Sequence, residues 1–155
     1  MSLTSGDWKR FISSLTSIVL TTVIVLVASI SLHEVGHLVL GDMLGCTGGK
    51  IILFDDANPT GPYTSMACSA QNQALLSLTG FPFPLIFAAA FYLLGGRERY
   101  LSFLFLGFGV LLGGVDILII YNSAIATALL SLFGMSFICW GEIRYLNLQL
   151  EDIWF

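Results

Sequence analysis

Charged side chains are scarce in this chain. Asp, Glu, Lys and Arg make up 10% of its 155 residues, whereas 56% of the residues are hydrophobic. Soluble domains carry about 25% charged residues, so the composition excludes an ordinary soluble domain and indicates a membrane protein. The length leaves room for one domain. We expect residues 1–155 to form a single membrane-embedded unit, with a core over about 11–122 and a fourth helix and amphipathic tail over 123–155.

Positive charge is scarcer than negative charge. Six Lys and Arg residues stand against ten Asp and Glu residues, which leaves a net charge of −4. A nucleic-acid-binding surface needs a basic patch or stripe, and no such cluster is present in the sequence. We therefore predict no nucleic-acid partner, and the lipid bilayer is the first expected partner.

Cysteine is also rare. The three cysteines, Cys46, Cys68 and Cys139, form no CxxC pair and no disulfide framework. Cys46 and Cys68 flank the same polar segment, which leaves open that they approach each other or a metal ion. The favoured interpretation is that all three are small, buried apolar residues.

Long apolar runs are abundant. They cover about 11–40, 73–94, 100–121 and 123–140, and a membrane-spanning helix needs about 20 residues. The fourth run is short, so it could be tilted, partly interfacial, or continued by the tail to Leu150. The apolar stretch 11–32 follows two basic residues as in a signal peptide, but it exceeds the usual apolar region of about 7–15 residues. We expect it to be a retained transmembrane helix.

The polar segment 45–72 separates the first two spans. Residues 50–54 are strand-like, 55–59 are turn-like, and 61–65 can return as a second strand. The predicted fold is an all-α polytopic membrane protein with about four transmembrane helices and a small β-hairpin between the first and second. Pro82 and Pro84 predict an interruption of the second span, either as a tolerated kink or as a break that lines a polar cavity.

Histidine occurs only twice, and both copies lie in the pentapeptide His33-Glu34-Val35-Gly36-His37. On a helix, positions i and i+4 share a face, so both imidazoles can reach one metal ion. Glu34 lies one position along, where it can hold a metal-activated water rather than bind the metal. Three ionisable groups within five residues of a membrane helix indicate a functional site.

A third metal ligand is expected at Asp116. Catalytic zinc usually takes three protein ligands, and Asp116 is the only charged residue between Tyr100 and Tyr121. If the spans alternate in direction, the first and third run parallel, which brings Asp116 to about the depth of His37. The alternative is a buried, hydrogen-bonded carboxylate without a metal.

These residues resemble the site-2 protease family of intramembrane zinc metalloproteases. The resemblance covers about residues 20–122 and depends mainly on the motif from His33 to His37. It implies that His33, His37 and Asp116 bind Zn²⁺ and that Glu34 is the general base.

Two further motifs of that family are weak in this chain. The second core helix of the family often has Gly-Pro with a nearby Asn, whereas here Gly80-Phe81-Pro82 has an insertion and no such Asn. The third motif usually reads Leu-Asp-Gly, whereas Ile117 follows Asp116. The resemblance therefore implies a divergent, minimal member of the family.

The expected activity is that of a zinc metalloendopeptidase that hydrolyses peptide bonds of membrane-anchored protein substrates. A substrate must be extended before it is cut, and the strand Ile51, Ile52, Leu53 and Phe54 is the candidate that binds it by strand addition. Two alternatives stay open: a non-catalytic, protease-like membrane subunit or assembly factor, and a zinc hydrolase with a non-peptide substrate. The oligomeric state stays open as well.

Two indications of the orientation in the membrane disagree. Five basic residues fall on one predicted side, and only Lys50 falls on the other; the five are Lys9, Arg10, Arg97, Arg99 and Arg144. Cytoplasmic loops carry the excess of Lys and Arg, which places the N-terminus in the cytoplasm. The family resemblance implies instead that the hairpin side is cytoplasmic.

Overall fold

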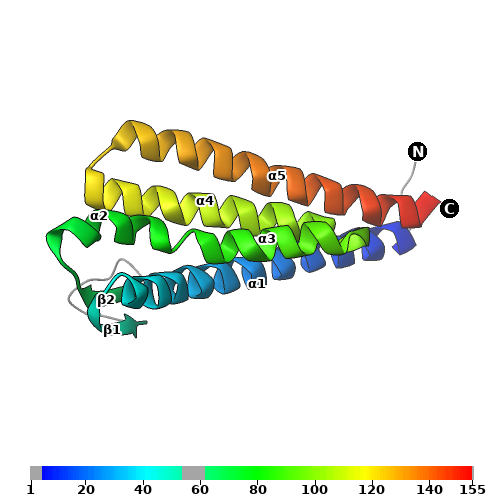
Figure 1. The fold of residues 1–155 in the computed structure, drawn as a ribbon. Coiled ribbons are helices and arrows are strands. Elements are labelled where there is room, and N and C mark those ends of the chain that lie inside the picture. The colour runs from blue at the N-terminus through cyan, green and yellow to red at the C-terminus, as the bar shows by residue number, and fades with distance from the viewer. Residues whose placement is uncertain (1–4, 54–61, 155) are drawn as a thin grey trace.

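The computed structural model describes residues 5–53 and 62–154. The helices lie side by side in an elongated bundle, with the β-hairpin at one end and both termini at the other (Figure 1). The elements in chain order are α1 (Ser5–Met43), β1 (Thr47–Ile52), β2 (Tyr63–Ala67), α2 (Ala70–Thr79), α3 (Pro82–Leu94), the 3₁₀ turn η1 (Gly96–Glu98), α4 (Arg99–Tyr121) and α5 (Ala124–Trp154). The predicted fold class is confirmed.

Among the described residues, three helical segments are long and apolar enough to cross a membrane. They are Trp8–Met43, Arg99–Ile119 and Ala124–Gln149, and many of their large apolar side chains are exposed, as expected for lipid-facing surfaces. These segments are consistent with a multi-pass membrane protein. The expected fourth span and tail form one continuous helix, because α5 runs without interruption to Trp154.

The second expected span is divided into two helices. α2 ends at Thr79, and α3 begins at Pro82. Pro82 and Pro84 have no amide N–H, so they leave the carbonyls of Leu78 and Gly80 without their usual helical donors. Pro84 is fully buried and packs against α4, where a Cβ added to Gly109 would lie 2.9 Å from the proline Cβ.

α4 is the central helix of the bundle. Its residues Leu104, Phe105 and Phe108 form the buried core with residues of α1, α3 and α5. α4 and α5 cross at Gly107 and Gly134, since a Cβ on either glycine would lie within 2.8 Å of the other's carbonyl oxygen. Small residues at such crossings allow close backbone approach in membranes. Asp116 therefore lies on the helix that shares the buried core with α1, α3 and α5.

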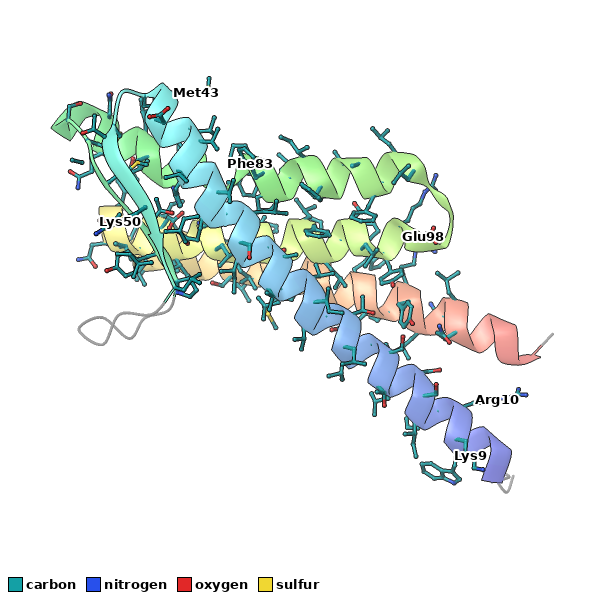
Figure 2. The ribbon with its side chains drawn as sticks, turned by 90° about the horizontal axis from the view of Figure 1, so that it is seen from below. Lys9, Arg10, Met43, Lys50, Phe83 and Glu98 are labelled. Carbon is teal, nitrogen blue, oxygen red and sulfur yellow. A yellow bond between two sulfur atoms is a disulfide. The ribbon has the colours of Figure 1, made fainter. Side chains whose placement is uncertain are left out.

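The hairpin lies against the C-terminal end of α1 (Figure 2). Its strands are antiparallel, with Lys50 paired with Ser65, Ile51 with Thr64, and Ile52 with Tyr63. β1 begins at Thr47, earlier than predicted, and its register shifts between Thr47 and Lys50. The expected turn over 55–59 lies outside the described residues.

A disulfide bond between Cys46 and Cys68 closes the base of the hairpin. The prediction that these two residues are merely small apolar residues is wrong. The strand register explains the bond, because Thr47 pairs with Ala67 and the two cysteines are the next residues outward. The bond joins the end of α1 to the start of α2. Cys139 is free, but it is exposed on α5, so the prediction that it is buried is wrong as well.

Candidate metal centre

The three predicted metal ligands meet at the hairpin end of the bundle. His33 Nε2 lies 2.9 Å from Asp116 Oδ2, and His37 Nε2 lies 3.1 Å from the same oxygen. The two Nε2 atoms are 3.1 Å apart. The helical spacing in α1 aligns the two imidazoles, and α4 runs parallel to α1 and supplies the carboxylate (Figure 1). Both histidines are buried.

The His37 ring is oriented by the end of α2. Its Nδ1 atom lies 2.9 Å from the carbonyl oxygen of Leu76 and 2.9 Å from Thr79 Oγ1. The Thr79 hydroxyl donates its own hydrogen to the same carbonyl, at 2.6 Å. A carbonyl oxygen can only accept, so His37 Nδ1 carries a proton and donates it to Leu76, which turns Nε2 toward Asp116.

Three possible metal-ligand atoms face one space. In the neutral form of His37 that carries its proton on Nδ1, the Nε2 lone pair points at Asp116 Oδ2, and His33 Nε2 faces the same oxygen. Two imidazole nitrogens and one carboxylate oxygen form a common ligand set for first-row metals, and the cluster can hold a metal ion.

A pair of glycines makes room for this cluster. A Cβ on Gly80 would lie 2.5 Å from His33 Cε1, and a Cβ on Gly36 would lie 2.6 Å from the Thr79 carbonyl oxygen. α1 therefore contacts the α2–α3 break with backbone against backbone. The interruption between α2 and α3, which the prolines predict, therefore packs against the His33 imidazole ring through Gly80.

Glu34 is buried and hydrogen-bonded to the hairpin. Thr64 Oγ1 in β2 lies 2.8 Å from Glu34 Oε2 and 3.0 Å from the Glu34 backbone carbonyl oxygen, and its hydroxyl donates to them. Glu34 does not belong to the cluster of three possible ligands. Glu34 thus lies one position along α1 from His33 and outside the ligand set, and its role as a general base stays a prediction.

The two histidines differ in their outer hydrogen bonds. Among the described residues, His33 Nδ1 has no hydrogen-bond partner, and neither does Ser29 Oγ, one helical turn earlier on α1. Ser29 is fully buried. The outer hydrogen bonds that orient the cluster therefore come through His37.

The predicted substrate strand is close to Glu34. Ile51 and Ile52 lie in β1 and are half-buried, Leu53 follows the strand and is exposed, and Phe54 lies outside the described residues. Ile51 pairs with Thr64, whose hydroxyl donates to Glu34. β1 is thus one strand, about 4.8 Å, from the strand that supports the expected base.

A groove of about 410 Å³ lies beside the hairpin, and none of the three metal ligands lines it. It has both polar and apolar surface and is formed by the last turns of α1 and both strands; the lining residues are Leu38, Val39, Asp42, Met43, Cys46, Gly49 and Met66.

Three residues around the site were missed in the sequence: Thr64, Thr79 and Gly80 as a contact of His33. Thr64 lies within the predicted second strand, but its partner depends on how the hairpin docks.

Comparisons with known protein families, with curated proteins and with solved structures found no match. The function therefore has to be inferred from the chemistry of the site.

Proposed function

We propose that this chain is an intramembrane zinc metallopeptidase of the site-2 protease type. The observation that carries the proposal is the convergence of His33, His37 and Asp116 beside a buried carboxylate, Glu34, that stays out of the ligand set. A site with ligands and a separate base is what metal-assisted hydrolysis requires.

Zinc fits the dimensions of the cluster. Tetrahedral bonds of about 2.0–2.1 Å to nitrogen and oxygen separate ligand atoms by roughly 3.3–3.4 Å. The three atoms now lie 2.9–3.1 Å apart, so each pair has to open by only a few tenths of an ångström. Carboxylate and imidazole ligands also accept other first-row metals, and a metal assay has to establish which one is native.

The bound metal would supply Lewis acidity, which acidifies water and polarises a carbonyl group. Glu34 would take a proton from the attacking water as that water adds to the carbonyl carbon. The same carboxyl would deliver the proton to the leaving amine as the C–N bond breaks. Thr64 holds this carboxylate through its hydroxyl, and Leu76 and Thr79 hold His37 in the required tautomer.

The substrate would be a membrane-anchored protein with an extended segment. A helix hides its amides in internal hydrogen bonds, so the segment to be cut has to unwind and form new backbone bonds. Strand addition to β1, along Ile51, Ile52, Leu53 and Phe54, would supply them. The pairing of Ile51 with Thr64 supports this choice, since it ties the strand to the residue that holds Glu34.

The non-catalytic alternative predicts a closed metal site with four protein ligands. Cys46 was one candidate for a fourth ligand, but its sulfur is bonded to Cys68. Within the described residues the cluster has three ligands, which leaves a coordination position for water or substrate. This favours an enzyme. A hydrolase that acts on a non-peptide substrate would use the same site. The product that the protein releases distinguishes it from a peptidase.

The direct test compares membranes from cells that produce the wild-type protein or Glu34→Gln. We expect new protein N-termini, mapped by mass spectrometry, in the wild-type sample only, with initial cleavage rates about 100- to 10,000-fold lower in the variant. The matched control is Glu142→Gln, the same change on α5, which should leave cleavage intact.

Purified Glu34→Gln should still bind one zinc ion, measured by elemental analysis. The proposal is wrong if the purified wild-type protein takes up no metal, or if Glu34→Gln cuts the same bonds at the wild-type rate. Metal-dependent turnover of a lipid without new N-termini would identify the non-peptide hydrolase instead.

A further inference from the structure

The two ends of the bundle differ in charge. Lys9 and Arg10 lie in the first turns of α1, and Figure 2 shows them, with Glu98 of η1, toward the end that carries the termini. Arg97 and Arg99 are the sequence neighbours of Glu98, in η1 and at the start of α4. Arg144 lies about 30 Å along α5 from its start at the hairpin end, which is about the thickness of the hydrocarbon core. Lys50 is the single basic residue at the hairpin end.

This distribution orients the chain. Lys and Arg in short loops are retained on the cytoplasmic side, whereas Asp and Glu contribute little to orientation. Five basic residues against one therefore place the terminal end in the cytoplasm. The hairpin end then faces the opposite side.

The disulfide supplies an independent indication from the other end of the molecule. Cys46 and Cys68 are bonded at the base of the hairpin, and disulfides persist in oxidising compartments but are rare where thiols are kept reduced. A covalent bond at the hairpin end and the charges at the terminal end depend on different physics, yet both point to the same orientation.

We infer that the metal centre faces the oxidising, non-cytoplasmic side of its membrane. The centre lies on the hairpin side of the bundle, because His37 precedes the end of α1 by six residues and Asp116 precedes the end of α4 by five. At 1.5 Å per residue these positions lie about 8–9 Å from the helix ends. The family resemblance implies the reverse orientation, so this chain would work from the other face.

A substrate class follows from this orientation, and this step rests on the proposed function. The bond to be cut would lie near the non-cytoplasmic end of a substrate's transmembrane segment, next to a stretch that can extend along β1. Hydrolysis there would release the non-cytoplasmic part of the substrate to that side of the membrane.

Labelling with a membrane-impermeant maleimide tests the orientation in intact cells. The full chain carries Cys139→Ser to remove the free thiol, together with one new cysteine. Ala124→Cys lies at the hairpin end where α5 begins, and Glu98→Cys lies at the terminal end; both positions are exposed. We expect Ala124→Cys to be labelled in intact cells and Glu98→Cys only after permeabilisation. The reverse pattern, or labelling of both in intact cells, overturns the inference.

The state of the native cysteines gives a second readout without any substitution. The wild-type protein is denatured rapidly in the presence of a polymer-linked maleimide, so that each free thiol adds mass. We expect one tag, on Cys139, without reductant and three tags with it. Three tags without reductant would overturn the inference. Neither readout needs catalysis, so an inactive but correctly oriented protein would refute the proposed function alone.

Discussion

The bundle has a polar region toward each end, and the two regions differ in the kind of contact that their polar groups make. At the terminal end, α1 and α5 are joined by hydrogen bonds in which donors meet acceptors: Ser17 with Tyr145 at 2.6 Å, Thr22 with Glu142 at 3.3 Å, and Ser14 with Gln149 at 3.4 Å. We call these residues the α1–α5 seam. At the hairpin end, two imidazole nitrogens and a carboxylate oxygen converge within 3.1 Å.

The difference shows what marks a functional site in a membrane protein. Polar residues between membrane helices are common, and hydrogen bonds such as those of the seam hold helices together. Glu142 is ionisable and lies within the candidate span Ala124–Gln149, and Thr22 donates a hydrogen bond to it. Among the described residues, three possible metal-ligand atoms converge only at the hairpin end, and such a convergence is what a metal cation requires.

Asp116→Asn should have the largest effect on metal binding. The change removes the carboxylate charge at nearly constant volume, and we expect zinc affinity to fall by more than about 100-fold, beyond the 10- to 100-fold typical of outer-shell changes. Competition with a chelating dye would measure the loss. Glu142→Gln makes the same kind of change in the seam and should bind zinc like the wild type. If Asp116→Asn also binds like the wild type, Asp116 is a hydrogen-bonding carboxylate and not a ligand.

Thr79→Val should weaken zinc binding about 10-fold, at the lower end of the outer-shell range. The isosteric valine removes the hydroxyl that contacts His37 Nδ1 but leaves the Leu76 carbonyl as an acceptor. The chelator competition used for Asp116 would measure it. Thr16→Val is the matched control, because Thr16 lies in the N-terminal half of α1, away from the site, and its hydroxyl donates only within its own helix, to the Ile12 carbonyl. Equal zinc affinity in both variants would show that the Leu76 carbonyl alone orients the ring.

The parts that could be predicted from the sequence depend on local periodicity. The i, i+4 spacing of His33 and His37, and the alternating direction of the spans, were enough to bring Asp116 to the correct depth. The disulfide could not be predicted, because it depends on a strand register that a shift between Thr47 and Lys50 alters. The contacts of Thr64 and Thr79 depend on how the hairpin and the α2–α3 break dock on α1, and no sequence period encodes that docking.

Thr64→Val should lower the rate of cleavage more than it affects metal binding. The change removes the hydroxyl that donates to Glu34 Oε2, so the carboxylate loses one fixed orientation while the three ligands keep theirs. We expect kcat to fall about 10-fold, below the full contribution of a general base, with unchanged zinc affinity. Thr64→Ser should restore the rate because it keeps the hydroxyl. A loss of zinc affinity would mean instead that the hairpin holds the ligands.

Ser17→Ala should have the smallest effect of these substitutions, because it changes the seam and not the metal site. It removes the seam hydrogen bond to Tyr145, and such bonds contribute about 0.6 kcal/mol on average in a membrane protein. We expect a slight loss of stability, measured by unfolding in mixed micelles, and no change in zinc affinity, since the seam lies at the opposite end of the bundle (Figure 1). A weaker zinc site in Ser17→Ala would show that the two ends are coupled through α1, and the seam could then no longer be treated as structural alone.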